Sequence, residues 1–305
     1  MMATPSTISA RPSIDLRDAA TSRGRKRSAR IRRFVRTGGA PVGLVVLTVV
    51  LVSAVFAPVV APQDPAAQDI LHRLGPPFKD GSGHLLGSDN LGRDVLSRLI
   101  YGSRVSLLVG ATSVLIAGGV GVVLGLLSGY YGGRVDSVIS WLANVQLSFP
   151  FILLVIALVA VVGAGLLNVI IVLGIASWVV YQRVVRAEVL AIREREYIEA
   201  ARVIGAKDGR ILTRHILPNL LTPLIVIGTL QIAQMIIAES ALSFLGLGVQ
   251  PSIPSWGSML ADGRNYLTVA WWVATLPGIA IVITVLSINV LGDWLRDELD
   301  PRLRT

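Results

Sequence analysis

Long apolar runs separated by short polar segments make up most of this 305-residue chain. A helix needs about 20 apolar residues to cross the hydrocarbon core of a bilayer, and it satisfies its own backbone hydrogen bonds there. The pattern therefore predicts an all-α polytopic membrane protein with six transmembrane helices. The six runs cover residues 41–60, 105–130, 137–162, 166–181, 217–242 and 271–291.

Proline and small residues add detail to these helices. Pro150 lies inside the third run and predicts a kink or an unwound turn, a feature that often lines a pathway. Along the second run, Ala117, Gly121, Gly125 and Gly129 recur every four residues. Such a stripe favours close packing of two helices over a ligand site, because glycine has no side chain to bind with.

The segments between the runs complete a predicted organisation. Trp178 and Tyr181 close the short fourth run and are predicted to be interfacial anchors. A proline-rich segment with Trp256 follows the fifth run and predicts a rigid outer loop. The predicted parts are a basic disordered cytoplasmic arm (1–40), a first transmembrane helix (41–61), an extracytoplasmic segment with an amphipathic helix (62–103), a five-helix core (104–293) with a cytoplasmic loop (186–218), and a cytoplasmic tail (294–305).

Charge predicts the orientation in the membrane. Residues 1–36 hold ten basic and two acidic side chains, so +8 of the formal net charge of +9 lies in this arm. Residues 183–214 hold eight basic and five acidic side chains, a net charge of +3. Basic flanks stay in the cytoplasm, so the arm and this loop are predicted to lie inside. Nucleic-acid binding is not favoured because Phe34 is the only aromatic residue of the arm, and a cleaved signal peptide is not favoured because the arm is very long.

The charged loop itself predicts two short helices joined by a bend. Arg193 to Ile204 is helix-forming, Gly205 suits a left-handed helix end, and Asp208 is a suitable cap for a second helix that ends before Pro218. An ordinary solvated loop between two spans is the alternative interpretation.

Around the bend, small and charged residues indicate a docking surface. Ala200 and Ala201 would leave a patch almost free of side chains, which a partner could approach closely. The side chains that could pair with charges of that partner are those of Glu199, Arg202, Lys207 and Arg210.

The order of these residues resembles a known family. Glu199-Ala200-Ala201, then Gly205 and Pro218, resembles the EAA loop of the membrane subunits of bacterial ABC importers, which inserts into the ATPase subunit. His215 stands where the general pattern often has isoleucine, and the form of residues 214–219 is similar to the peptide and nickel branch. Residues 87–107 and 238–257 resemble the same branch, with Ser88 in place of threonine.

The resemblance, which covers about residues 80–303, implies a fold and an assembly. The fold is the MetI-like type I ABC importer permease fold, with both termini in the cytoplasm of a bacterium and the helices in its inner membrane. The implied partners are a homologous second permease, two ABC ATPase subunits, an extracytoplasmic solute-binding protein and membrane lipid, with no nucleic acid. ATP and magnesium would bind to the ATPase subunits, and no cofactor or metal would bind to this chain.

Candidate residues for the pathway or an outer gate lie elsewhere. In residues 87–107, a cap at Ser88 or Asp89 and apolar residues at helical spacing predict the amphipathic helix. Asp89, Arg93 and Asp94 on it could contact a binding protein or form a gate, or merely brace the bundle; a metal site lacks a third ligand with matching spacing.

Glu239 is a further candidate, because a carboxylate at membrane depth is costly unless it faces protein or water. We favour a position at the outer interface for it.

Composition excludes several classes of function. The chain has no cysteine, and it has no Gly-x-x-x-x-Gly-Lys-Ser/Thr loop for ATP. Its three histidines fall in two predicted compartments, so an enzyme is not favoured.

Peptide is the first predicted substrate and nickel the second. An ion-coupled secondary transporter, which would need more intramembrane charges than Glu239, and a structural scaffold stay as alternatives.

Overall fold

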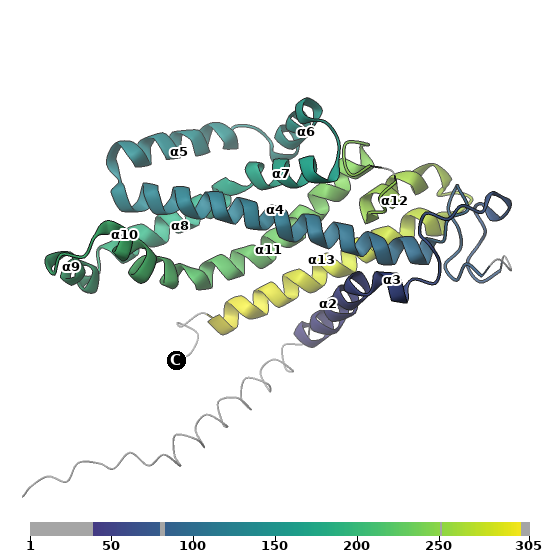
Figure 1. Ribbon diagram of the computed structural model, residues 1–305, viewed down its shortest axis with the longest axis horizontal. Coiled ribbons are helices and arrows are strands. Elements are labelled where there is room, and N and C mark those ends of the chain that lie inside the picture. The colour runs from purple at the N-terminus through teal and green to yellow at the C-terminus, as the bar shows by residue number, and fades with distance from the viewer. Residues whose placement is uncertain (1–38, 80–82, 251, 300–305) are drawn as a thin grey trace, which may run out of the picture.

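The computed structural model describes residues 39–79, 83–250 and 252–299 of the chain. The elements in these ranges are helices, and Figure 1 shows the long ones side by side in an elongated bundle. The predicted basic arm, up to residue 38, and residues 300–305 of the predicted tail lie outside the described residues.

Four helical stretches of the described chain are long and apolar enough to cross a membrane. The first and the last are the single helices α4 (Val95–Tyr131) and α13 (Trp271–Leu299). Between them come Leu166–Arg193, which comprises α7 (Leu166–Ala176) and α8 (Trp178–Arg193), and Asp208–Phe244, which ends in α11 (Leu217–Phe244). All four contain predicted spans.

A bent pair of helices forms a fifth candidate span. Helices α5 (Gly133–Leu147) and α6 (Phe151–Val162) meet at an angle of 91° on either side of Pro150. Proline cannot donate a backbone hydrogen bond to the preceding turn, so the helix breaks there. The predicted kink at Pro150 is confirmed, and it is a full break.

The first apolar run is shorter and interrupted. Helix α2 (Ala40–Val55) has 16 residues, and α3 (Ala57–Val60) follows after Phe56. At a rise of about 1.5 Å per residue, α2 is about 24 Å long, which is less than the roughly 30 Å of a hydrocarbon core. The described chain thus contains four or five candidate spans and this shorter apolar helix.

Helix α4 corrects the predicted amphipathic helix. Its cap is Asp94, whose carboxylate accepts a hydrogen bond from the Ser97 amide at 2.7 Å, and not Ser88 or Asp89. Leu91 lies in the turn before it. The polar residues after Asp94 belong to the same unbroken helix as the second predicted span, so no helix end lies at the predicted boundary of residue 103.

Two other boundaries differ from the prediction for a similar reason. Helix α13 continues to Leu299, so the described part of the predicted tail extends a transmembrane helix. The predicted rigid loop around Trp256 contains α12 (Trp256–Gly263), which begins with a capping box at Ser255. Short 3₁₀ turns occur at Ile70–His72 and Arg264–Tyr266.

The stripe of small residues on α4 packs closely against another helix, as predicted, and that helix is α8. A Cβ atom on Gly125 would lie 2.6 Å from the Cβ of Val185, and one on Gly129 would lie 2.7 Å from the Cβ of Val189. Tyr181 is buried in this interface, and Trp178 is buried against Ile139 and Ala143 of α5. Their predicted role as interfacial anchors is therefore wrong: Tyr181 packs beside the glycines, and Trp178 packs against α5.

The two ends of the bundle differ in construction. Figure 1 shows α9 (Glu196–Val203) and α10 (Asp208–Arg210) at one end, and α12 with the segment before α4 at the other. The N-terminal end of α2 and the C-terminal end of α13 point toward the end of the bundle that carries α9 (Figure 1).

Candidate functional site

A helical lobe, residues 194–216, closes one end of the bundle. It consists of α9, a turn at Gly205, α10, and a π-helical segment over Ile211–Ile216. The first helix begins at Glu196, three residues later than predicted. The predicted left-handed end at Gly205 is confirmed, because its φ is 82°.

Two backbone hydrogen bonds fix this turn. The Ala206 amide donates to the Ala201 carbonyl at 3.0 Å, and the Gly205 amide donates to the Arg202 carbonyl at 2.9 Å. This is the Schellman pattern, which satisfies the last carbonyls of a helix. A Cβ on Gly205 would meet nothing within 4 Å, so the backbone conformation alone requires glycine here.

The second half of the lobe differs from the prediction. Asp208 does not cap a helix; its carboxylate accepts a hydrogen bond from the Tyr130 hydroxyl at 2.7 Å. The helix does not end before Pro218 either. It passes through the π-helical segment into α11, with Pro218 in the first turn, where the missing amide is tolerated.

The inner face of the lobe packs on the ends of α4 and α8. Its buried residues are Ile198, Ala201, Ile211 and Ile216, which pack with Tyr130, Val185, Val189 and Ile192. The predicted patch is thus half wrong: Ala201 is covered by its own chain, and Ala200 alone of the pair is exposed.

The outer face of the lobe exposes apolar side chains that sequence reasoning missed. Val203 is 87% exposed and Ile204 is 85% exposed. Nothing in the local pattern separates them from core residues, because their direction depends on how α9 packs. Glu199, Lys207 and Arg210 are also exposed on this lobe, while the Arg202 guanidinium lies 5.5 Å from the ring centre of Tyr130.

At the opposite end of the bundle, an ion-pair network joins the residues before α4 to α12. The buried Asp89 carboxylate accepts hydrogen bonds from Arg93 Nε at 2.6 Å and from Arg98. Asp262 accepts from both guanidinium groups, at 3.1 and 3.2 Å. Two carboxylates therefore balance two cations, which is the condition for burying charges at tolerable cost.

Asp94 does not belong to this network. It caps α4 and lies 3.3 Å from the Nδ1 atom of the buried His84. Asp89 and Asp94 therefore do not converge, and no group of three potential metal ligands occurs in the described ranges. Sequence reasoning found Asp89 and Arg93 but missed Arg98 and Asp262, because a pairing across 164 residues leaves no local signal.

The segment before this network is held by local polar contacts. The Leu74 amide donates to the Asp89 carbonyl at 2.9 Å, and the Gln63 amide donates to the Ser97 hydroxyl at 3.0 Å. Asp69 accepts a hydrogen bond from His72 Nδ1 at 2.7 Å, which lowers the pKa of that carboxyl below its usual range.

Glu239 lies near the end of α11, inside a cluster of serine hydroxyls. Its Oε1 atom accepts hydrogen bonds from Ser243 at 2.7 Å and from Ser255 at 2.9 Å, and its Oε2 atom lies 3.5 Å from the Ser106 hydroxyl. The side chain has no exposed surface, so it faces other parts of the protein, and its position at the outer interface stays a prediction. Glu239 joins α4, α11 and the start of α12.

A polar pocket between α5 and α8 was not predicted. Its volume is about 470 Å³, and it is lined by Ser140, Ala143, Asn144, Gln182, Arg183 and Arg186. Arg186 is neutralised by Asp136, at 2.5 and 2.6 Å, whereas Arg183 donates to the neutral Asn144 side chain at 3.0 Å and forms no ion pair within the described ranges. The pocket therefore leaves one guanidinium available to an anionic group. Pro150 lies beyond it, exposed at the bend.

Comparisons with known proteins agree with this architecture. The model of the family described as "Binding-protein-dependent transport system inner membrane component" matches residues 121–305, and that of the "N-terminal TM domain of oligopeptide transport permease C" matches residues 28–77. The chain is 46% identical over 274 residues to the di/tripeptide transport system permease protein DppC of Pseudomonas aeruginosa, covering 89% of this chain and 90% of that protein.

Other relatives and a solved structure point the same way. The chain is 44% identical over 277 residues to the glutathione transport system permease protein GsiD of Pectobacterium atrosepticum, covering 90% of each. An inward-facing structure of the MetNI methionine ABC transporter contains a chain with a TM-score of 0.53 and 22% identity, covering 67% of this chain and 96% of that one. The last likeness concerns the fold alone.

Proposed function

Because the chain belongs to the family of binding-protein-dependent transport system inner membrane components, we propose that it is a permease subunit of an ATP-driven ABC importer for di- and oligopeptides. The names of its relatives, which transport di- and tripeptides, dipeptides or glutathione, support peptide as the solute. In this proposal α2 and the bent pair both cross the bacterial inner membrane. Six spans then place both termini in the cytoplasm, on the side of the helical lobe.

The exposed apolar end of the helical lobe carries the proposal that this lobe docks an ATPase subunit. Val203 and Ile204 project from a helix end that the Gly205 turn fixes, and Glu199, Lys207 and Arg210 are exposed on the same lobe. Exposed apolar residues with a charged rim suit insertion of a short helix into a groove of another protein. The chain would bind no nucleotide itself; ATP and magnesium would bind to two such ATPase subunits.

The helical stretch Asp208–Phe244 supports a route from the lobe to the other end of the bundle. It leads from the helical lobe to Glu239, and the 31 residue steps from Asp208 to Glu239 correspond to about 45 Å of helix. When ATP closes the two ATPases, the lobe would move as a rigid body with this stretch. A homologous second permease would complete the pathway, which would switch between inward- and outward-facing states.

The opposite end would face a solute-binding protein. The ion-pair network around Asp89, Arg93 and Asp262 holds this surface together, so it would act as a rigid platform for docking. Asp94 would contribute by starting α4 at a fixed position.

The test is ATP hydrolysis by the full chain reconstituted with its second permease, both ATPases and the binding protein. Stimulation by short peptides supports the proposal. Stimulation by nickel alone would keep the assembly and replace the solute. Transport that depends on an ion gradient, without any ATPase, would support a secondary transporter instead.

A pair of variants tests the docking surface separately. Val203→Asp combined with Ile204→Asp should lower association with the ATPase subunits at least tenfold, because charged groups would replace the apolar contact. The control is Leu71→Asp, whose side chain is 92% exposed outside the lobe, before α4. Equal association of both variants in a pull-down from detergent would argue against docking at this surface.

A further inference from the structure

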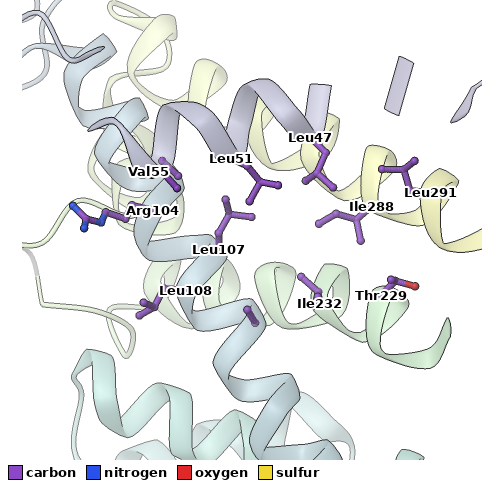
Figure 2. A pocket seen from close by; sticks show the side chains of 12 residues that line it. Leu47, Leu51, Val55, Arg104, Leu107, Leu108, Thr229, Ile232, Ile288 and Leu291 are labelled. Carbon is purple, nitrogen blue, oxygen red and sulfur yellow. The ribbon is translucent and has the colours of Figure 1, made fainter. Parts of the chain in front are cut away.

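An apolar groove lies on the side of the bundle between α2, α4, α11 and α13. Its volume is about 470 Å³, and ten of its twelve lining residues are apolar. Figure 2 shows Leu51, Leu107 and Ile288 directed into it from three of these helices. The polar atom of Thr229 is already used, because its hydroxyl donates to the Val226 carbonyl at 2.7 Å.

One cation stands at the rim of this groove. Figure 2 shows Arg104 at the end near Val55, with its guanidinium directed away from the apolar floor. The side chain is exposed, and no residue of the described ranges forms an ion pair or hydrogen bond with it. Every other described arginine of residues 90–110 is neutralised by a carboxylate.

Arg104 lies at the boundary between a polar and an apolar part of the bundle. It follows Tyr101 by one helical turn, and Tyr101 lines a polar recess together with Pro62, Gln63 and Asp64. The apolar part of the chain therefore begins near Arg104. A long basic side chain at such a boundary reaches toward the phosphate layer.

The length of the groove matches one leaflet. The residues that line it on α2 run from Leu47 to Val55, which corresponds to about 12 Å of helix. Half of the hydrocarbon core measures about 15 Å. A channel of this length fits one acyl chain, and the cation at its outer end complements the negative charge of the phosphate above that chain.

We propose that this groove is a binding site for a phospholipid of the outer leaflet, with one acyl chain between α2 and α4 and the phosphate on Arg104. The lipid would fill the space between α2 and the rest of the bundle, and so fix the position of α2. This inference does not depend on which solute the protein transports.

The experiment uses the full chain in bilayer discs of phosphatidylethanolamine and phosphatidylglycerol, in which the phosphatidylglycerol carries a photoreactive group on one acyl chain. Mass spectrometry should place the crosslinks on residues 47–55 and 104–111, which line the groove. Arg104→Gln should lower this crosslinking about fivefold, the factor that corresponds to about 1 kcal/mol per basic residue beside an anionic lipid surface. Arg134→Gln is the matched control, since Arg134 is also exposed and lies on α5.

A second variant separates the groove from the charge. Ala111→Phe keeps Arg104 but fills the groove, so it should also lower crosslinking at Leu107. Crosslinks spread evenly over the exposed face of α2, at Val45 and Val49 as much as at Leu51, would overturn the proposal. So would equal crosslinking in Arg104→Gln and the native chain, or protection of the groove by the second permease in the assembled complex.

Discussion

Glu239 is a carboxyl group buried among hydroxyls, without a cation among the described residues that contact it. Ser243, Ser255 and Ser106 come from three different elements, so the side chain acts as a polar joint between α11, α4 and the cap of α12. Ser255 serves twice, since its hydroxyl also accepts from the Ser258 amide at 3.1 Å. Removal of the carboxyl would therefore disturb a helix cap as well.

Two substitutions at Glu239 should differ in stability. Glu239→Leu leaves the serine hydroxyls without their acceptor, and each unsatisfied buried group costs about 1–3 kcal/mol, so the unfolding temperature should fall clearly. Glu239→Gln keeps one side-chain oxygen and should cost about 1 kcal/mol. Thermal unfolding of the purified chain in detergent measures both. Equal losses for the two variants would show that the serines do not depend on this acceptor.

At the scale of elements, the contact between α4 and α8 depends on glycine. Val185 and Val189 occupy the space that side chains at Gly125 and Gly129 would need. Lipid provides no hydrophobic force between helices, so close backbone approach is what stabilises such a pair.

A matched pair of variants on α4 measures this contact. Gly125→Leu should cost about 1–3 kcal/mol or prevent folding, because its Cβ would overlap Val185. Gly119→Leu should be tolerated, since a Cβ at Gly119 meets nothing within 4 Å. Expression level and thermal unfolding serve as the two measurements. A Gly119→Leu protein as unstable as Gly125→Leu would mean that helix packing is not the cause.

The ion-pair network makes a second prediction for elements. Asp89→Asn should destabilise the chain by about 3 kcal/mol or more, because it leaves Arg93 and Arg98 buried beside a neutral group. Asp262→Asn should cost less, because Asp262 is 32% exposed and water can replace part of its charge. Denaturation of each variant in detergent gives the order, and a larger loss at Asp262 would contradict the assigned geometry.

At the scale of the whole molecule, features that depend on neighbouring residues in the chain could be predicted from the sequence. Contacts between residues far apart in the chain could not. Apolar runs, the small-residue stripe and the left-handed glycine depend on neighbours in the chain, so they are predictable. The role of Trp178 and Tyr181 was not predictable, because an aromatic residue near a helix end has the same local sequence pattern whether it lies in a membrane interface or in a packed core. Helix boundaries at Val95 and Leu299 were missed because polar turns extend these helices beyond their apolar parts.

The same division applies to the candidate site. Gly205 could be placed from its chemistry, since few residues other than glycine take a positive φ. The direction of Val203 and Ile204 and the pairing of Asp262 with Arg98 depend on the packing of separate elements. No local spacing encodes these contacts.

The central claim for the whole molecule is that the helical lobe transmits ATPase motion to the pathway. The most direct measurement is peptide uptake by vesicles that contain the assembled complex with Gly205→Pro. Proline cannot adopt a φ of 82° and has no amide for the Arg202 carbonyl, so the turn should lose its geometry. Gly209→Ala, in the same lobe but without a positive φ, is the control.

We predict that the Gly205→Pro chain still inserts into the membrane and joins its partners, while peptide uptake falls at least tenfold and uptake by the Gly209→Ala complex stays near native. Native uptake by Gly205→Pro, with normal ATPase association, would contradict the proposed role of the lobe.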